Sequence, residues 1–276
     1  MTTPLHPEVA AMLEEQRRSG ARPRSLLSIE ETRDAVLAGR RWQGAPLDVP
    51  TRDTSANGVP VRLYGRESAT ALVFFHGGRF FSGNLDSHDA PLRLLAHLSG
   101  IQICAVDYRL APEHSHPAAM DDAITAARWL APQTSRLHIG GDSAGGYLAA
   151  ATALAVPAAA QMLIYPMLDP ACDTPSYQEF WRGPWPSGED MRRGWQLYGG
   201  PAIRPDAGLF PATLLITAGI DPLRDEALSF AGSLRAQGVT VTAHHFADMT
   251  HGFFTQTLLT RSQELMRLLA ASLSPQ

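Results

Sequence analysis

Short apolar runs alternate with helix-like patterns from about residue 45 to the end of the chain. The runs have the length of strands, and the longer segments between them repeat apolar residues at helical spacing. This alternation predicts an α/β fold with a mostly parallel, doubly wound sheet covered by helices. We expect eight strands, at residues 47–53, 61–64, 71–75, 101–108, 137–140, 162–165, 214–218 and 239–246. We expect helices near residues 87–99, 119–130, 144–156, 223–236 and 261–273.

Local signals refine the two ends of this outline. The pair Asn57-Gly58 favours a tight turn between the first two strands, so these strands are expected to form an antiparallel pair at the sheet edge. Thr260 and Gln263 have the spacing of a capping box, which predicts that the last helix begins there.

Two segments do not follow the alternation. Residues 1–44 are expected to form two helices, the second opened by a capping box of Ser28 and Glu31. Residues 170–200 are rich in aromatic side chains among prolines, glycines and charges, including Phe180, Trp181, Trp185, Trp195 and Tyr198. Such insertions commonly cover the carboxyl ends of strands, where open α/β sheets bind ligands. We therefore predict that the insertion at about 170–200 is a lid. The alternative is a helical insertion whose aromatic side chains only pack against the rest of the domain.

Composition narrows the classes of partner. The 276 residues carry a net charge of -4 and a pI near 6.2, with no run of lysine or arginine. Such a chain has no electrostatic reason to bind nucleic acid or an anionic membrane. The N-terminus lacks a leader pattern, and no segment approaches the roughly 18 apolar residues of a membrane span. We therefore expect a cytoplasmic protein without a membrane span.

Metal and disulfide chemistry is not favoured. Cys104 and Cys172 are the two cysteines, and they support neither a disulfide framework nor a cysteine-rich metal site. His114 and His116 lie beside Glu113, but no further ligand stands at zinc spacing. We expect no metal.

The most specific motif is the stretch 140–146, which reads Gly-Gly-Asp-Ser-Ala-Gly-Gly. It holds Gly-x-Ser-x-Gly between an expected strand and an expected helix. A serine at such a tight turn has a strained backbone, and side chains at Gly141 and Gly145 would collide with the neighbouring strand and helix. This context predicts Ser143 as a catalytic nucleophile. The alternative is a glycine-rich helix start that binds phosphate through backbone N–H groups.

A serine nucleophile needs a base and a group that orients the base. In folds with this motif the chain order is serine, acid, histidine, each at the end of a later strand. Asp221 and His251 fill these two positions. Asp225 and Asp248 are the rival acids, and we expect loop or helix-cap roles for them. Three other histidines lie within expected strands, where packed or exposed roles are favoured: His138, His244 and His245.

The stretch 76–81, His-Gly-Gly-Arg-Phe-Phe, follows the buried strand at 71–75. In serine hydrolases of this topology, N–H groups from this loop and from the residue after the nucleophile stabilise the tetrahedral oxyanion. We therefore predict an oxyanion hole formed by Gly77, Gly78 and Ala144. His76 is expected to brace the loop.

Five motifs in this order resemble the hormone-sensitive-lipase family of α/β-hydrolases. They are His76-Gly77-Gly78, the stretch 107–113, the stretch 141–146, the stretch 221–226 and His251-Gly252-Phe253. The resemblance covers nearly the whole chain. It implies an N-terminal helical lid segment at 1–44 and a catalytic domain at 45–276, with a second lid segment inserted at about 170–200. It implies the α/β-hydrolase fold and a cofactor-free bacterial carboxylesterase that prefers short to medium acyl chains. It also implies that Ser143 is the nucleophile, His251 the base and Asp221 the orienting acid. Within 107–113 we expect an ion pair between Arg109 and Glu113.

Arg79 departs from the resembling family, which usually has glycine at this position. The second and third positions of the family's glycine run are its main oxyanion donors, so the Arg79 N–H is a further candidate donor. If the loop needs a positive φ there, arginine is disfavoured by about 1 kcal/mol or more relative to glycine. The side chain has two alternatives, which the sequence leaves open. It either points away into an ion pair, or it forms part of the acyl pocket and favours an acidic or carbonyl-bearing substrate.

We therefore predict a serine carboxylesterase that hydrolyses short- to medium-chain acyl esters of small molecules through an acyl-enzyme. The alternatives on the same residues are a lactonase and an aryl-formamide amidase. A further alternative is a non-catalytic small-molecule receptor, as in the plant gibberellin receptors, which resemble this family but lack the catalytic histidine; the presence of His251 argues against it. The natural ester, and pairing of two chains through the edge strand at 239–246, stay open.

Overall fold

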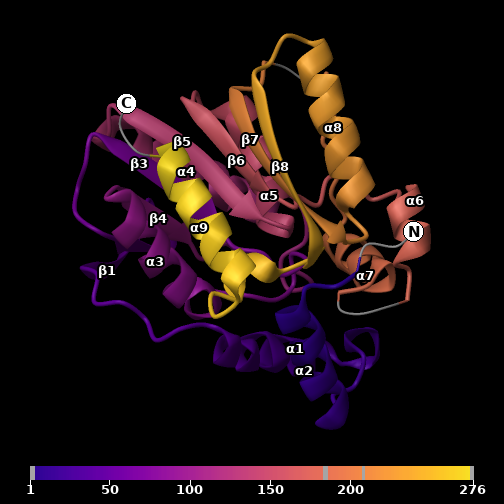
Figure 1. The fold of residues 1–276 in the computed structure, drawn as a ribbon. Helices are drawn as coiled ribbons and strands as arrows, with labels where there is room; N and C mark the ends of the chain where they lie inside the picture. The colour runs from indigo at the N-terminus through magenta and orange to yellow at the C-terminus, as the bar shows by residue number, and fades with distance from the viewer. Residues whose placement is uncertain (1–3, 183–185, 207–208, 274–276) are drawn as a thin grey trace.

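The computed structural model describes residues 4–182, 186–206 and 209–273. Its centre is an eight-stranded sheet of order β1-β2-β4-β3-β5-β6-β7-β8 (Figure 1). β1 and β2 are antiparallel, as are β2 and β4, and the neighbouring strands from β4 through to β8 are parallel. The strands are β1 Thr51–Ala56, β2 Val59–Tyr64, β3 Thr70–Phe75, β4 Gln102–Val106, β5 Arg136–Asp142, β6 Ala160–Ile164, β7 Ala212–Ile220 and β8 Val241–Thr250. The predicted α/β fold with a mostly parallel eight-stranded sheet is confirmed.

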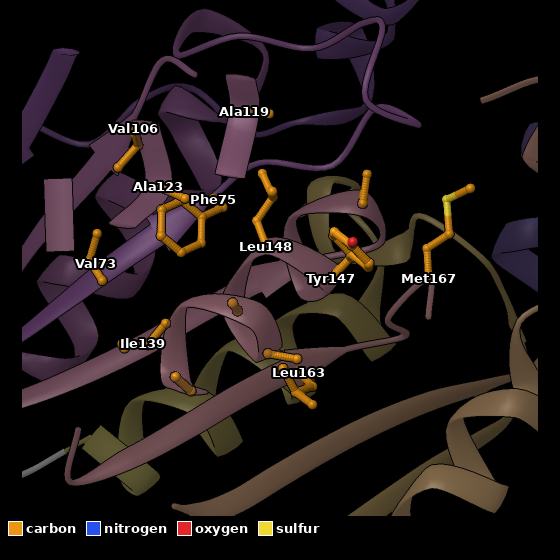
Figure 2. Close-up of a cluster of buried hydrophobic side chains, with 14 of the residues drawn as sticks. Val73, Phe75, Val106, Ala119, Ala123, Ile139, Tyr147, Leu148, Leu163 and Met167 are labelled. Atoms are coloured by element: carbon orange, nitrogen blue, oxygen red, sulfur yellow. The ribbon is translucent and has the colours of Figure 1, made fainter. Parts of the chain in front are cut away.

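Helices cover both faces of the sheet because its strands are apolar on both sides. On one face, Val73 and Phe75 of β3 share a core with α4, α5 and α8. On the other face, Leu72 and Phe74 share a core with α3 and α9. Figure 2 shows the first core, where Leu148 of α5 and Ala123 of α4 lie near Phe75. The helices are α3 Asp89–Ser99, α4 Ala118–Leu130, α5 Ala144–Ala155, α8 Arg224–Ala236 and α9 Thr260–Leu273.

The expected strands exist, but several of their bounds differ. The first strand runs over Thr51–Ala56 rather than 47–53, and the turn at Asn57 and Gly58 has positive φ angles of 52° and 98°. Both central residues of a type I′ turn need such angles. Three strands end later than their apolar runs, because polar and glycine residues continue the hydrogen-bonded ladder: β5 to Asp142, β7 to Ile220 and β8 to Thr250.

The segments outside the alternation are helical. The N-terminal part holds α1 Pro7–Arg18, the 3-10 turns η1 Arg24–Leu26 and η2 Gly39–Trp42, and α2 Ile29–Ala38. α1 and α2 lie together at one end of the sheet (Figure 1). The insertion holds α6 Pro175–Glu179 and α7 Gly188–Tyr198, while Trp185 lies outside the described residues. Within the described residues, no helix is long and apolar enough to cross a membrane.

The two expected capping boxes have different outcomes. Ser28 and Glu31 make both reciprocal hydrogen bonds at the start of α2, as predicted. At the start of α9 the helix begins at Thr260 as predicted, but the predicted partner of Thr260 in the capping box, Gln263, is wrong. The Thr260 N–H and hydroxyl both donate to the Glu8 carboxylate of α1, and the Gln263 amide donates to the Thr257 carbonyl instead. A carboxylate brought from the other end of the chain thus caps α9.

The predicted Arg109–Glu113 ion pair is wrong. The Arg109 guanidinium pairs with Asp122 of α4 at 2.8 Å, and the Glu113 carboxylate pairs with Arg33 of α2 at 2.7 Å. Arg33 also donates to the carbonyls of Phe81 and Ala111. Arg33 therefore ties α2 to the loops after β3 and β4.

Candidate active site

Four loops of the site begin immediately after parallel strands. His76, Ser143, Asp221 and His251 are the first residues after β3, β5, β7 and β8. Because parallel strands place their carboxyl ends at one edge of the sheet, these residues gather there although up to 175 positions separate them in the sequence.

The backbone at Ser143 is strained. Its φ is 56° and its ψ is -118°, outside the regions that side-chain-bearing residues prefer. The two flanking glycines permit this turn. A Cβ at Gly145 would overlap the Phe75 carbonyl, and a Cβ at Gly141 would overlap the Gly145 carbonyl. The tight turn between β5 and α5 therefore requires glycine at both positions.

Ser143, His251 and Asp221 form one hydrogen-bonded chain. The Ser143 hydroxyl lies 2.9 Å from His251 Nε2, and Asp221 Oδ2 lies 2.8 Å from His251 Nδ1. Asp221 is fully buried, and its Oδ1 accepts the Leu223 N–H at 2.8 Å. The Tyr165 ring packs on the imidazole with a centroid distance of 4.5 Å. These contacts fix the orientation of the imidazole between the hydroxyl and the carboxylate.

The loop after β3 is anchored by the residue that precedes the serine. The Gly77 N–H donates to Asp142 Oδ1 at 2.7 Å, and His88 Nε2 lies 3.1 Å from the same oxygen. The Gly77 N–H is thus engaged within the protein. Gly78 has a φ of 136°, and a Cβ there would overlap the Ser82 carbonyl. The loop therefore turns sharply at Gly78.

His76 lies beneath this loop. Its ring stacks on Tyr108 at a centroid distance of 4.3 Å, and Nδ1 lies 2.8 Å from the Gly77 carbonyl oxygen. Burial, reinforced by the nearby His88, lowers the pKa of His76 to about 3. The ring is therefore neutral at pH 7, where Nδ1–H can donate to Gly77. These contacts support the expected bracing role.

Arg79 has a positive φ of 56°, the conformation in which arginine is disfavoured relative to glycine. Its guanidinium is buried, lies 3.5 Å from Asp190 of α7 and stands over the Phe81 ring at 4.9 Å. Burial lowers the pKa of Arg79 to about 10, partly offset by Asp190. The side chain thus combines the two predicted alternatives, because it approaches an acidic partner and also lines the cavity described next.

A cavity of about 130 Å³ opens at Ser143 and His251. Gly77, Gly78 and Arg79 line it on the sheet side. Residues of both helical segments outside the alternation also line it, namely Gln16, Arg24, Val36, Gly39, Trp42, Gln43, Pro186 and Met191. The cavity therefore lies between the sheet edge and these two segments.

The rival residues lie elsewhere. Asp225 accepts the Ser176 N–H and pairs with Arg224, while Asp248 pairs with Arg261. Both carboxylates stabilise local structure. His138, His244 and His245 are on β5 and β8, and His116 packs on Tyr198. Cys104 and Cys172 are buried free thiols. Among the described residues, no group of three or more side chains is arranged to hold a metal ion.

Sequence reasoning missed three residues around the site. Asp142 anchors Gly77, Asp190 approaches Arg79, and Arg24 lines the cavity. Asp142 lies directly before Ser143 inside the serine motif, and this position was a signal that could have been followed. Asp190 is the third residue of a capping box with Ser187, a local signal that could have been found. Arg24 has no local signal, since only the packing of the N-terminal segment brings it here.

Comparison with known proteins shows similarity to α/β-hydrolases and esterases along most of the chain. Residues 72–255 match the family described as the alpha/beta hydrolase fold. An ethyl acetate hydrolase of Pseudomonas putida is 34% identical over 90% of this chain and 92% of its own. A hyperthermophilic esterase from Pyrobaculum calidifontis superposes with a TM-score of 0.87 at 30% identity, covering 98% of each chain. A gibberellin receptor of Arabidopsis thaliana is 29% identical over 79% of this chain and 69% of its own.

Proposed function

The chain belongs to the hormone-sensitive-lipase family of α/β-hydrolases, and from this premise we propose that it is a serine carboxylesterase acting on short- to medium-chain acyl esters. One observation carries the proposal. The hydroxyl of Ser143, the imidazole of His251 and the carboxylate of Asp221 form a continuous hydrogen-bonded chain at the edge of a cavity. This is the arrangement that nucleophilic acyl transfer requires.

In the proposed reaction, the Ser143 hydroxyl attacks the ester carbonyl while His251 Nε2 accepts its proton. Asp221 holds Nδ1–H and stabilises the imidazolium that forms. The imidazolium then protonates the leaving alkoxide, which departs as the alcohol. Water, deprotonated by the same nitrogen, hydrolyses the acyl-enzyme and releases the carboxylic acid.

The oxyanion of each tetrahedral intermediate needs N–H donors near Ser143. We assign this role to Ala144, the residue after the nucleophile, and to Gly78 and Arg79 of the loop after β3. Gly77 was predicted as a donor as well, but its N–H donates to Asp142. We therefore give Gly77 the role of anchoring the loop that presents the other donors.

We propose that the helical segments 1–44 and about 170–200 serve as lids over the catalytic domain. Their residues line the cavity beside Ser143, which supports this role. A cavity of about 130 Å³ favours small acyl groups. Such a cover would also exclude bulk water and strengthen the electrostatic stabilisation of the oxyanion.

The test is hydrolysis of p-nitrophenyl butanoate by the wild type and by Ser143→Ala. The variant should lose at least about 1,000-fold in kcat, because triad residues act as a unit. A circular dichroism spectrum equal to that of the wild type would show that the fold is intact. Full activity in a folded Ser143→Ala protein would refute the proposal.

A further inference from the structure

Two arginines line the cavity that holds Ser143 and His251. Arg79 comes from the loop after β3, and Arg24 comes from η1 of the N-terminal segment. The Arg79 side chain is 5% exposed, and Nε of the partly exposed Arg24 is buried. Burial lowers the pKa of Arg24 as well as that of Arg79, and the proximity of Arg79 lowers the pKa of Arg24 further. Both arginines thus line one cavity, and the Asp190 carboxylate partly offsets the lowering of the pKa of each.

The carboxylate beside them leaves Arg79 unsatisfied. Asp190 Oδ1 lies 3.5 Å from Arg79 Nη1, which is longer than a hydrogen bond. The other oxygen, Oδ2, already accepts the N–H and the hydroxyl of Ser187. Among the described residues, the Arg79 guanidinium makes no hydrogen bond, although it carries five N–H donors. Donors of a charged group at such low exposure are normally paired, and the described residues supply no hydrogen-bond acceptor for this one.

A third arginine adds to the positive potential. Arg193 of α7 stands over the same Phe81 ring as Arg79, at 5.5 Å, and its charge further lowers the pKa of Arg79. Asp142 also lines the cavity, but its Oδ1 is engaged by the Gly77 N–H and lies beside His88. The wall formed by Arg24 and Arg79, backed by Arg193, is therefore suited to an anion.

Arg79 has its side chain on a strained backbone. Glycine would adopt the φ of 56° at position 79 without the penalty of about 1 kcal/mol or more that a side chain brings. α7 also packs directly on this residue, since a Cβ at Gly194 would lie 2.7 Å from the Arg79 Cβ. This packing restricts the arginine side chain. Strain kept at an active-site loop is a reason to look for function.

We propose that the preferred substrates are esters that carry a free carboxylate, which the guanidinium groups of Arg79 and Arg24 bind while Ser143 attacks the ester carbonyl. This inference rests on the proposed esterase function and names the substrate class of that site. Guanidinium binds carboxylate through paired, charge-assisted hydrogen bonds, which gives both affinity and orientation. Because Ser143, Arg24 and Arg79 line the same cavity, we place the carboxylate within a few carbons of the ester.

The carboxylate could sit on either side of the ester bond, so the test has two arms. Monoethyl glutarate carries it on the acyl side, and ethyl 5-methylhexanoate is its neutral counterpart of similar shape. 3-Acetoxypropanoate carries it on the alcohol side, with 3-methylbutyl acetate as counterpart. In at least one arm, the wild-type kcat/KM for the anionic ester should exceed that for its neutral counterpart by about tenfold or more. A ratio of about tenfold is what one additional favourable charge interaction with the substrate would give.

The variants Arg24→Gln and Arg79→Gly should each reduce this anionic-to-neutral ratio by about tenfold. Arg79→Gly keeps the backbone N–H and relieves the strain, so it separates the side chain from the oxyanion loop. Arg24→Lys keeps a charge and should retain part of the preference. Arg18→Gln is the matched control, because it removes an exposed charge from α1 and should leave the ratio unchanged.

The outcomes separate this inference from the esterase function. Hydrolysis of the neutral esters at equal or higher kcat/KM in both arms would overturn the inference and leave the esterase standing. A ratio that neither Arg24→Gln nor Arg79→Gly changes would also overturn it. Failure to hydrolyse any of the four esters would count against the esterase function itself. The anionic-to-neutral ratio of kcat/KM in the wild type tests the inference even if a variant does not fold.

Discussion

The imidazole of His76 shows how a buried, uncharged histidine supports a catalytic loop. It stacks on Tyr108, and its Nδ1 lies within hydrogen-bond distance of the Gly77 carbonyl oxygen. The Tyr108 hydroxyl in turn donates to the His76 carbonyl at 2.7 Å. These contacts hold the backbone from which Gly78 and Arg79 extend.

This burial predicts a pH dependence of stability. The unfolded chain protonates His76 below about pH 6.5, whereas burial lowers the pKa of the native residue to about 3. The unfolded state therefore binds more protons between these values, and stability falls as the pH drops through that window. The slope from this group approaches about 1.4 kcal/mol per pH unit. In His76→Gln, urea denaturation at pH 6, 5 and 4 should give a shallower fall than in the wild type; parallel curves would contradict the neutral buried imidazole.

Asp142 offers a second prediction at this scale. Asp142→Ala removes the acceptor of the Gly77 N–H and should loosen the oxyanion loop. We expect kcat for p-nitrophenyl butanoate to fall about tenfold to a hundredfold, less than the loss of a whole oxyanion donor. Asp142→Asn is the control, since its amide oxygen can still accept the bond and should preserve more activity. Equal losses in both variants would show that the charge matters, rather than the anchor.

At the scale of elements, the turn from β5 into α5 depends on the absence of side chains. Gly145→Ala would place a Cβ against the Phe75 carbonyl of β3, so we expect a loss of at least about 2 kcal/mol in the free energy of unfolding. Gly232→Ala on α8 is the matched control. Its Cβ would meet none of the described atoms within 4 Å, and it should stabilise the protein by about 0.5–1 kcal/mol. Urea denaturation measures both, and equal effects would contradict the close packing.

The same elements show what local sequence can predict. Short sequence patterns predict which segments are strands and which are helices. They also predict the order of the catalytic serine, acid and histidine, and the structure brings these three residues together at one edge of the sheet. Strand ends were less predictable, because β5 continues through the paired polar residue Asp142 and β7 continues past an irregularity at Gly219. The glycine at 219 permits the irregularity between β7 and β8, where a Cβ would overlap the Ala247 carbonyl.

At the scale of the whole molecule, the ion pairs were beyond sequence reasoning. Arg109 was expected to pair within its own motif, but α4 brings Asp122 to it. Glu113 pairs with Arg33, 80 positions away. Arg24 reaches the cavity by the same packing of the N-terminal segment. Such partners depend on how distant segments pack, which no short pattern encodes.

Arg33 allows a test of that packing. Arg33→Ala removes the hydrogen bonds from α2 to the Phe81 and Ala111 carbonyls and to Glu113, so the N-terminal segment should open more often. We expect faster thermolysin cleavage within residues 19–45 than in the wild type. Arg40→Ala, an exposed change in the same segment, should not accelerate cleavage. Equal cleavage rates in the two variants would contradict this anchoring role.

The central claim is that Ser143, which follows β5, is activated by His251 and Asp221, which follow β8 and β7. The most direct measurement is intact-protein and peptide mass spectrometry after incubation with a p-nitrophenyl alkylphosphonate. We predict one phosphonyl adduct per chain, located on Ser143, with labelling strongly slowed in His251→Ala. Absence of an adduct, or an adduct on another residue at the wild-type rate, would contradict the account.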